Sequence, residues 1–228
     1  MRFIHTSDWH LGRVLCGERL IDDQQHVLAQ LIGIAREFRP AVVLVAGDVY
    51  DRAVPAPDAV RLLDEVISEL VLGVGVEVAM IAGNHDSAAR LSFGSRILAR
   101  HRLHVAGSLR EGPHVLRLGD DAGEVSFCSV PYAEPAVVAE ELGAAAVRDH
   151  DTAMRGAIAQ IRAEVPSGRA VLMAHAFVPG SIESESERSL TVGGTGAVGP
   201  DAFEDFDYVA LGHLHRPQAV GREGVRYA

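Results

Sequence analysis

The chain has 228 residues, of which 48% are hydrophobic and 23% are charged, as is ordinary for a soluble globular protein of one large or two small domains. The formal net charge of −10 argues against a protein that coats nucleic acid by itself, because such proteins need a basic surface. No apolar run approaches the roughly 20 residues that span a bilayer, and neither a signal peptide nor a disulfide is expected, which favours a cytoplasmic protein without a membrane segment.

Along the first hundred residues, short apolar runs alternate with amphipathic stretches, and this pattern predicts strands that alternate with helices. In chain order we expect a strand at 3–6, a helix at 22–38, a strand at 41–46, a helix that Asp58 caps, a strand at 76–82 and a helix at 87–100.

From residue 103 the pattern changes. We expect antiparallel strands at 103–106, 114–118 and 124–130 with a hairpin turn at 119–123, then a helix at 149–165, strands at 170–174 and 208–211, and a hairpin from 218 to the end. The Gly- and Ser-rich segment 179–200 is expected to be a loop, either functional or disordered. These elements predict an α/β fold, a layered αββα sandwich of two mixed β-sheets flanked by helices.

Side chains of the kinds that bind metals follow five of the predicted strands. The five segments are Asp8-Trp9-His10, Gly47-Asp48, Gly83-Asn84-His85-Asp86, Ala174-His175 and Gly212-His213-Leu214-His215. Sites in α/β sheets lie beyond the carboxyl ends of strands, so we expect these segments to meet. Strand alternation would also place Asp8 and His10 on one side, and likewise His213 and His215. Two adjacent divalent ions held by such groups are suited to phosphate-ester hydrolysis.

Each of these residues also has a structural alternative. Asp8 and Asp48 could cap helices or turns, Asn84 could hold a tight turn, and His175 could be a satisfied core histidine. Carboxylate, amide and imidazole groups without thiolate favour Mn²⁺, Fe²⁺ or Zn²⁺ at a catalytic centre over a structural zinc site. Asp48 follows the central strand, which makes it the natural bridging ligand.

The two residues after Asn84 are assigned to catalysis. His85 is expected to stabilise the transition state or to protonate the leaving oxygen. Asp86 is expected to orient His85 or to close the turn.

The order of these motifs resembles the calcineurin-like metallophosphoesterase superfamily. Four longer stretches, 6–12, 46–52, 82–87 and 210–216, resemble more narrowly the bacterial SbcD nucleases. The resemblance implies the metallophosphoesterase fold, two Mn²⁺ per chain with Fe²⁺, Zn²⁺ or Mg²⁺ as possible substitutes, and DNA cleavage in repair and recombination. The implied activities are a 3′-to-5′ exonuclease on duplex ends and an endonuclease on single strands or hairpins.

The resemblance also implies roles for individual residues and for partners. By motif, one ion would be held by Asp8, His10, Asp48 and His215, the other by Asp48, Asn84, His175 and His213, with His85 catalytic. The implied partners are DNA and an SMC-like ATPase of the SbcC type, bound by a homodimer within a heterotetramer.

Two departures from the family pattern matter. Asp51-Arg52 stands where archaeal and eukaryotic relatives have a further histidine, so Arg52 is a candidate substrate contact, with a plain salt bridge as the equal alternative. Family chains also continue beyond position 228, so residues 1–228 are expected to be a nuclease domain without its C-terminal capping and partner-binding regions. Two other functions stay open, a phosphodiesterase or phosphatase for a small nucleotide and a non-catalytic scaffold for a partner ATPase.

Overall fold

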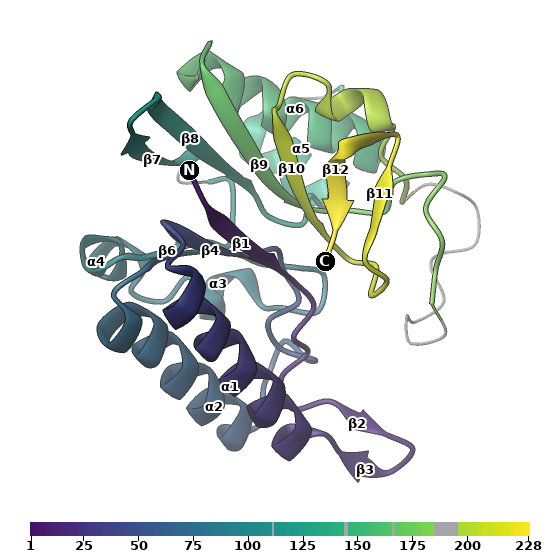
Figure 1. Ribbon diagram of the computed structural model, residues 1–228. Helices are drawn as coiled ribbons and strands as arrows, with labels where there is room; N and C mark the ends of the chain where they lie inside the picture. The colour runs from purple at the N-terminus through teal and green to yellow at the C-terminus, as the bar shows by residue number, and fades with distance from the viewer. Residues whose placement is uncertain (111, 144–145, 166, 185–195) are drawn as a thin grey trace.

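Two β-sheets lie face to face at the centre of the computed structural model, and helices cover the outer face of each sheet (Figure 1). The structure describes residues 1–110, 112–143, 146–165, 167–184 and 196–228. This architecture confirms the predicted α/β sandwich. Within these ranges, every helix is too short or too polar to cross a membrane.

The first sheet has four strands in the order β1-β4-β5-β6, and all are parallel. The strands are β1 Phe3–Thr6, β4 Val42–Val45, β5 Glu77–Ile81 and β6 Leu103–Ala106. Its outer face is covered by α1 Ile21–Phe38, α2 Pro57–Ser68 and the π-helical turn η1 Glu69–Val74. A small hairpin of β2 Val14–Leu15 and β3 Glu18–Arg19 projects beyond α1 (Figure 1).

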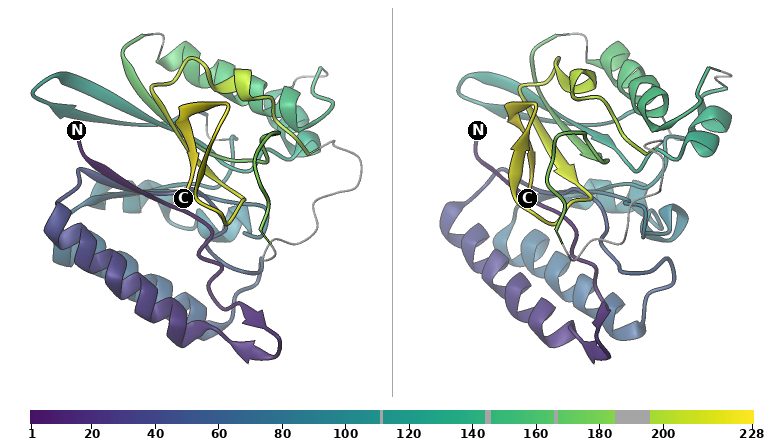
Figure 2. Two further views of the ribbon diagram at one scale, coloured as in Figure 1. Left: turned by 45° about the vertical axis from the view of Figure 1, so that its right-hand side comes forward. Right: turned by 90° about the vertical axis from the view of Figure 1, so that its right-hand side faces the viewer.

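The second sheet has six strands in the order β11-β12-β10-β9-β8-β7 and is mixed. Its strands are β7 His114–Asp120, β8 Gly123–Val130, β9 Arg169–His175, β10 Tyr208–Gly212, β11 Gln218–Val220 and β12 Arg222–Tyr227. The helices α5 Pro135–Leu142 and α6 His150–Glu164 and the 3₁₀ turn η3 Pro200–Phe203 pack on its outer side. Figure 2 shows the two helical layers on opposite sides of the paired sheets.

Alternation along the central strand β4 divides its side chains between two apolar layers. Val42 and Leu44 point between the sheets, where they pack with Phe127 of the second sheet. Val43 and Val45 point toward α1 and α2. Because both faces are buried, the strand is apolar throughout, as in other sheets covered on both sides.

Two predictions for residues 87–106 were wrong. Strand β6 is parallel to β5, because a helical crossover returns the chain to the same end of the sheet. The single helix expected at 87–100 is divided into α3 Ala88–Leu91, α4 Ser95–Leu98 and the 3₁₀ turn η2 Ala99–His101. Gly94 has a φ of 75°, and this left-handed residue interrupts the helix between α3 and α4.

Helix α2 begins differently from the prediction. Ala56 is the N-cap residue and Pro57 takes the first helical position, where a missing N–H is tolerated. Asp58 lies in the first turn instead, and its Oδ1 accepts the Ala59 N–H at 2.9 Å.

Two elements had not been predicted, the helix α5 and the β2–β3 hairpin. The expected loop at 179–200 falls partly on residues 185–195, which lie outside the described residues. Beyond that gap, Ala197 pairs with Phe177, and Val198 is buried in the core beneath the second sheet.

The inter-sheet core yields a test of the architecture. Phe127 is 2% exposed, and its ring meets Phe3 edge-on with centroids 5.9 Å apart. We expect Phe127→Ala to lower the free energy of unfolding by about 3–5 kcal/mol in urea titrations, because it leaves a cavity between the sheets. The control Leu72→Ala removes a side chain that is 80% exposed, and it should change stability by less than about 0.5 kcal/mol. Similar effects of both substitutions would contradict this placement of Phe127.

Candidate metal centre

The loops that follow β1, β4, β5, β9 and β10 meet at one edge of the two sheets. Backbone hydrogen bonds join the first two loops, from Asp8 N–H to the Gly47 carbonyl at 3.0 Å and from His10 N–H to the Asp48 carbonyl at 2.9 Å. The five segments singled out in the sequence therefore lie together, as expected from the edge of an α/β sheet.

The backbone reaches this arrangement through unusual conformations. Asp8, His10, Asp48 and His213 have positive φ values of 53°, 44°, 49° and 107°. The strands end earlier, at Thr6 and Gly212, so strand alternation is not what directs these side chains. Non-glycine residues in such conformations are strained, and they gather at functional sites.

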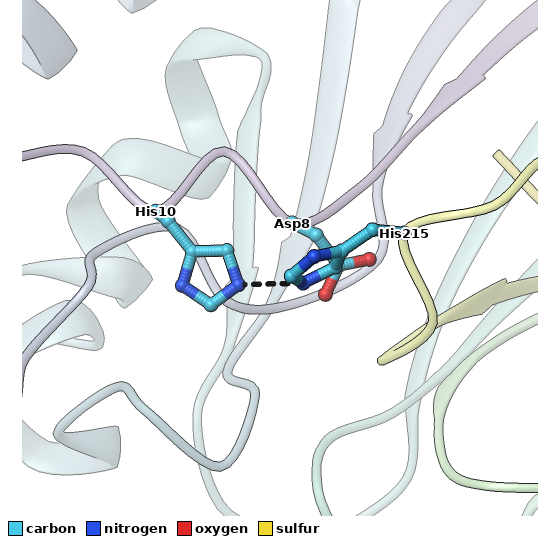
Figure 3. Close-up of side chains that lie close together, drawn as sticks. All are labelled: Asp8, His10 and His215. Atoms are coloured by element: carbon cyan, nitrogen blue, oxygen red, sulfur yellow. Dashed lines mark hydrogen bonds between the residues drawn. The ribbon is translucent and has the colours of Figure 1, made fainter. Parts of the chain in front are cut away.

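A first group consists of Asp8, His10 and His215, whose potential ligand atoms lie within 4.8 Å of one another (Figure 3). The Nε2 atoms of His10 and His215 are 3.1 Å apart. Two imidazole nitrogens at this separation need a proton or a cation between them. Both oxygens of Asp8 lie 3.1 Å from the His213 N–H, which orients the carboxylate.

A second group surrounds the fully buried His175. Its Nδ1–H donates to the Ala46 carbonyl at 2.9 Å, so Nε2 is turned toward the site. This Nε2 lies 2.9 Å from Asn84 Oδ1 and 3.3 Å from His213 Nδ1, and the latter is 3.0 Å from the same amide oxygen. An imidazole held through its other nitrogen is typical of metal-binding histidines.

Asp48 lies between the two groups. Its Oδ2 is 3.6 Å from His10 Nε2 in the first group and 3.5 Å from His175 Nε2 in the second. Its Oδ1 accepts the His85 N–H at 2.8 Å, which fixes the carboxylate. Burial would raise the pKa of Asp48, but the neighbouring histidines and this hydrogen bond hold it well below its usual range.

His85 stands beside Asp48 and is held from the far side of its ring. Its Nδ1–H donates to the Asp51 carbonyl at 3.0 Å, and Nε2 lies 3.9 Å from Asp48 Oδ2. The ring also meets His10 edge-on, with centroids 4.8 Å apart. The free Nε2 edge therefore faces the centre, as a proton donor to a substrate would need.

Asp86 contacts backbone groups. Its Oδ2 accepts the N–H groups of Gly83 and Val49 at 2.9 and 3.0 Å, and its Oδ1 accepts that of Tyr50 at 2.9 Å. These bonds tie the loops after β4 and β5 together. They favour the turn-closing role for Asp86, and a direct part in proton transfer stays a prediction.

Two residues that the sequence analysis had not identified support the site. Gln24 of α1 donates from Nε2 to the carbonyls of Trp9 and His10 at 3.0 and 2.7 Å, and nothing local in the sequence signals this. Asp51 holds His85 through its carbonyl, and its Oδ1 lies 3.5 Å from the buried Nδ1 of His10. Its position in the Gly-Asp motif was the available signal.

Arg52 lies at the rim. Its side chain is 72% exposed, and its Nε is 3.8 Å from Asp51 Oδ2. Such a long, exposed ion pair contributes little to stability, so the guanidinium is accessible to a substrate. A contact between Arg52 and substrate phosphate remains a prediction.

Two glycines allow the loops to approach this closely. A Cβ on Gly83 would lie 2.1 Å from Asp48 Oδ1, and a Cβ on Gly47 would lie 2.3 Å from His175 Nδ1. Any side chain at either position would displace a candidate ligand. The glycines of the Gly-Asp and Gly-Asn motifs are thus steric requirements of the site.

The donor set suits divalent cations. Oxygen and imidazole donors without thiolate match catalytic Mn²⁺, Fe²⁺ or Zn²⁺, and the described residues form overlapping groups able to hold an ion. Burial lowers the pKa of both His10 and His213 to about 3, so these imidazoles are neutral and able to bind. Burial raises the pKa of Asp8 to about 7. His175 differs, because Asp48 and Asp8 outweigh its burial and raise its pKa to about 9.

Comparisons with known proteins agree with this geometry. The family model of the calcineurin-like phosphoesterases matches residues 1–217. Over 229 aligned residues, the whole chain is 34% identical to the SbcD component of the SbcCD nuclease from Staphylococcus saprophyticus subsp. saprophyticus and 31% identical to the same component from Staphylococcus epidermidis. The chain spans 60% of the length of each of these relatives.

A solved structure shows the same fold. A dimetal phosphatase from Danio rerio superposes with a TM-score of 0.58 at 13% identity, over 99% of this chain and 85% of that one. At such low identity the likeness supports the fold alone.

The position of Asp48 between the groups predicts how metal content responds to its loss. We expect Asp48→Asn to reduce bound metal by more than one ion per chain in elemental analysis, because both groups lose a shared anionic donor. Asp22→Asn, at the exposed first turn of α1, is the matched control and should leave metal content unchanged. Unchanged occupancy in the Asp48 variant would rule out a bridging role.

The raised pKa of His175 predicts proton release on metal binding. At neutral pH an imidazole with a pKa of about 9 carries a proton, which an incoming ion must displace from Nε2. Calorimetric titrations in buffers of different ionisation enthalpy should therefore detect about one or more protons released per chain. His175→Gln should release about one proton fewer, and equal release from both proteins would contradict the assignment.

Proposed function

Because the chain belongs to the calcineurin-like phosphoesterase family, we propose that it is the nuclease domain of an SbcD-type protein that hydrolyses phosphodiester bonds in DNA. The observation that carries the proposal is the pairing of two donor groups through Asp48, with His85 facing the same space. Full-chain identity of 34% to a nuclease component supports DNA as the substrate over other phosphate esters.

We assign the donors to two ions by the two groups seen in the fold. Asp8, His10, Asp48 and His215 would hold one ion, and Asp48, Asn84, His175 and His213 the other, with Mn²⁺ as the expected metal and Fe²⁺, Zn²⁺ or Mg²⁺ as substitutes. Two such ions supply Lewis-acid activation of water and neutralise charge on the phosphoryl group.

The protein's own residues prepare the rest of the reaction. His85 is the proposed proton donor to the leaving oxygen, since the Asp51 carbonyl fixes its Nδ1–H and leaves Nε2 for the substrate. Asp86 and Gln24 are positioning residues, which hold the loops that carry Asp48 and His10. Arg52 is proposed to contact a substrate phosphate from the rim.

The proposed setting is a cytoplasmic complex. The names of the two staphylococcal relatives describe them as one component of a two-component nuclease, which supports an SbcC-type SMC-like ATPase and a homodimer as partners here. The net charge of −10 leads us to propose that tight DNA binding needs this dimer and the ATPase, because the domain lacks a generally basic surface.

A paired substrate assay tests the activity. Purified protein with Mn²⁺ is incubated with labelled duplex and single-stranded DNA and, separately, with bis-p-nitrophenyl phosphate. We expect cleavage of both kinds of substrate, and a reduction of about 10²- to 10⁴-fold in DNA cleavage for His85→Gln, because a positioned proton donor is lost.

The control for this variant is His101→Gln, an exposed histidine of η2, which should cleave DNA like the wild type. Hydrolysis of the small ester without any DNA cleavage would favour an enzyme for small nucleotides. No hydrolysis of either substrate, even with the partner ATPase present, would favour the scaffold.

A further inference from the structure

A cavity of about 320 Å³ opens beside Asn84, between the loop after β5 and the start of α5. This volume is at the lower end of the range for pockets that hold small ligands. Its wall includes the ring of Tyr132 and the apolar side chains of Leu109 and Val138. Asn84 belongs both to this cavity and to the metal centre, so the two spaces are continuous.

Tyr132 is held at the boundary by contacts on several sides. Its N–H donates to the Ala82 carbonyl at 2.8 Å, which ties the segment after β8 to the end of β5. Its ring lies edge-on to His175 with centroids 6.1 Å apart, and 5.3 Å from the ring of His150. A fixed aromatic ring at a cavity wall is a platform on which another flat ring can stack.

The charges around the cavity indicate which part of a substrate it can accept. Among the described residues that line it none is basic, whereas Asp86, Glu134 and Glu141 are acidic. Asp86 is occupied by backbone N–H groups, and Glu141 by Ser108 and Leu109. A phosphate group would be repelled here, but an uncharged ring with polar edges would find an apolar floor and carboxylate acceptors.

We propose that this cavity receives the nucleobase of the nucleotide next to the cleaved phosphodiester, stacked on Tyr132. The inference rests on the proposed function and specifies its substrate site. Stacking tolerates any base, and it supplies affinity that an acidic chain cannot obtain from backbone charge alone. A base can enter only when it is unpaired, so the cavity would select single strands and opened duplex ends.

A fluorescence experiment tests stacking directly. His85→Gln protein with Mn²⁺, which binds without rapid cleavage, is titrated with a single-stranded oligonucleotide that carries 2-aminopurine at its terminal nucleotide. We expect quenching on binding, its loss in the additional variant Tyr132→Ala, and a Kd weakened by about 5- to 100-fold. Tyr132→Phe keeps the ring and should retain both. Quenching and affinity that persist in Tyr132→Ala would overturn the proposal.

Cleavage rates separate a substrate contact from mere support of His175. With His85 intact, we expect Tyr132→Ala to reduce kcat/KM for DNA by a larger factor than for bis-p-nitrophenyl phosphate, which has no base. An abasic terminal nucleotide should slow the wild type and leave the variant little affected. The control Phe38→Ala removes a 40% exposed ring at the far end of α1 and should change neither rate.

The outcomes distinguish the two proposals. A wild-type protein that hydrolyses the small ester but neither binds nor cleaves DNA would refute the proposed function. A wild type that cleaves DNA, together with a Tyr132→Ala variant that loses both activities by the same factor or loses bound metal, would refute the base site alone. In that case Tyr132 only supports His175.

Discussion

The buried carboxylate of Asp48 is the group on which the rest of the site depends. It is reached from both donor groups, its Oδ1 is fixed by a backbone N–H, and its loop is bonded to the loop that carries Asp8 and His10. A charge buried to 2% exposure would be costly without such partners. The surrounding imidazoles, the left-handed backbone and the two tight glycines are therefore parts of one solution to placing a negative group at the seam between the sheets.

Charge and function fit together once the site is separated from the surface. A net charge of −10 is unfavourable for a protein that must approach DNA by itself. Positive charge from divalent ions would be local to the strand ends, and the neighbouring cavity offers a ring and apolar walls instead of cations. An enzyme built in this way depends on local chemistry for its substrate and on its partners for long-range attraction.

Much of the architecture could be predicted because the signals were local. The apolar run of β4 and the capping residue Asp149 of α6 marked their elements directly, and the glycine-containing motifs marked the edge where the ligands gather. What failed depended on geometry beyond the local sequence. The direction of β6 followed from a crossover, and the side chains of Asp8 and His213 are directed by left-handed backbone after their strands have ended. Gln24 supports the site from a distant helix, which no local pattern announces.

The donors come from both sheets, and this has a consequence for biosynthesis. Asp8, His10, Asp48 and Asn84 follow strands of the first sheet, whereas His175, His213 and His215 follow strands of the second. A nascent chain that has left the ribosome only as far as β8 has a complete first sheet but none of the latter imidazoles. The centre cannot assemble until β10 has docked, so the hydrolytic potential of the polypeptide is withheld until translation of this domain is nearly over.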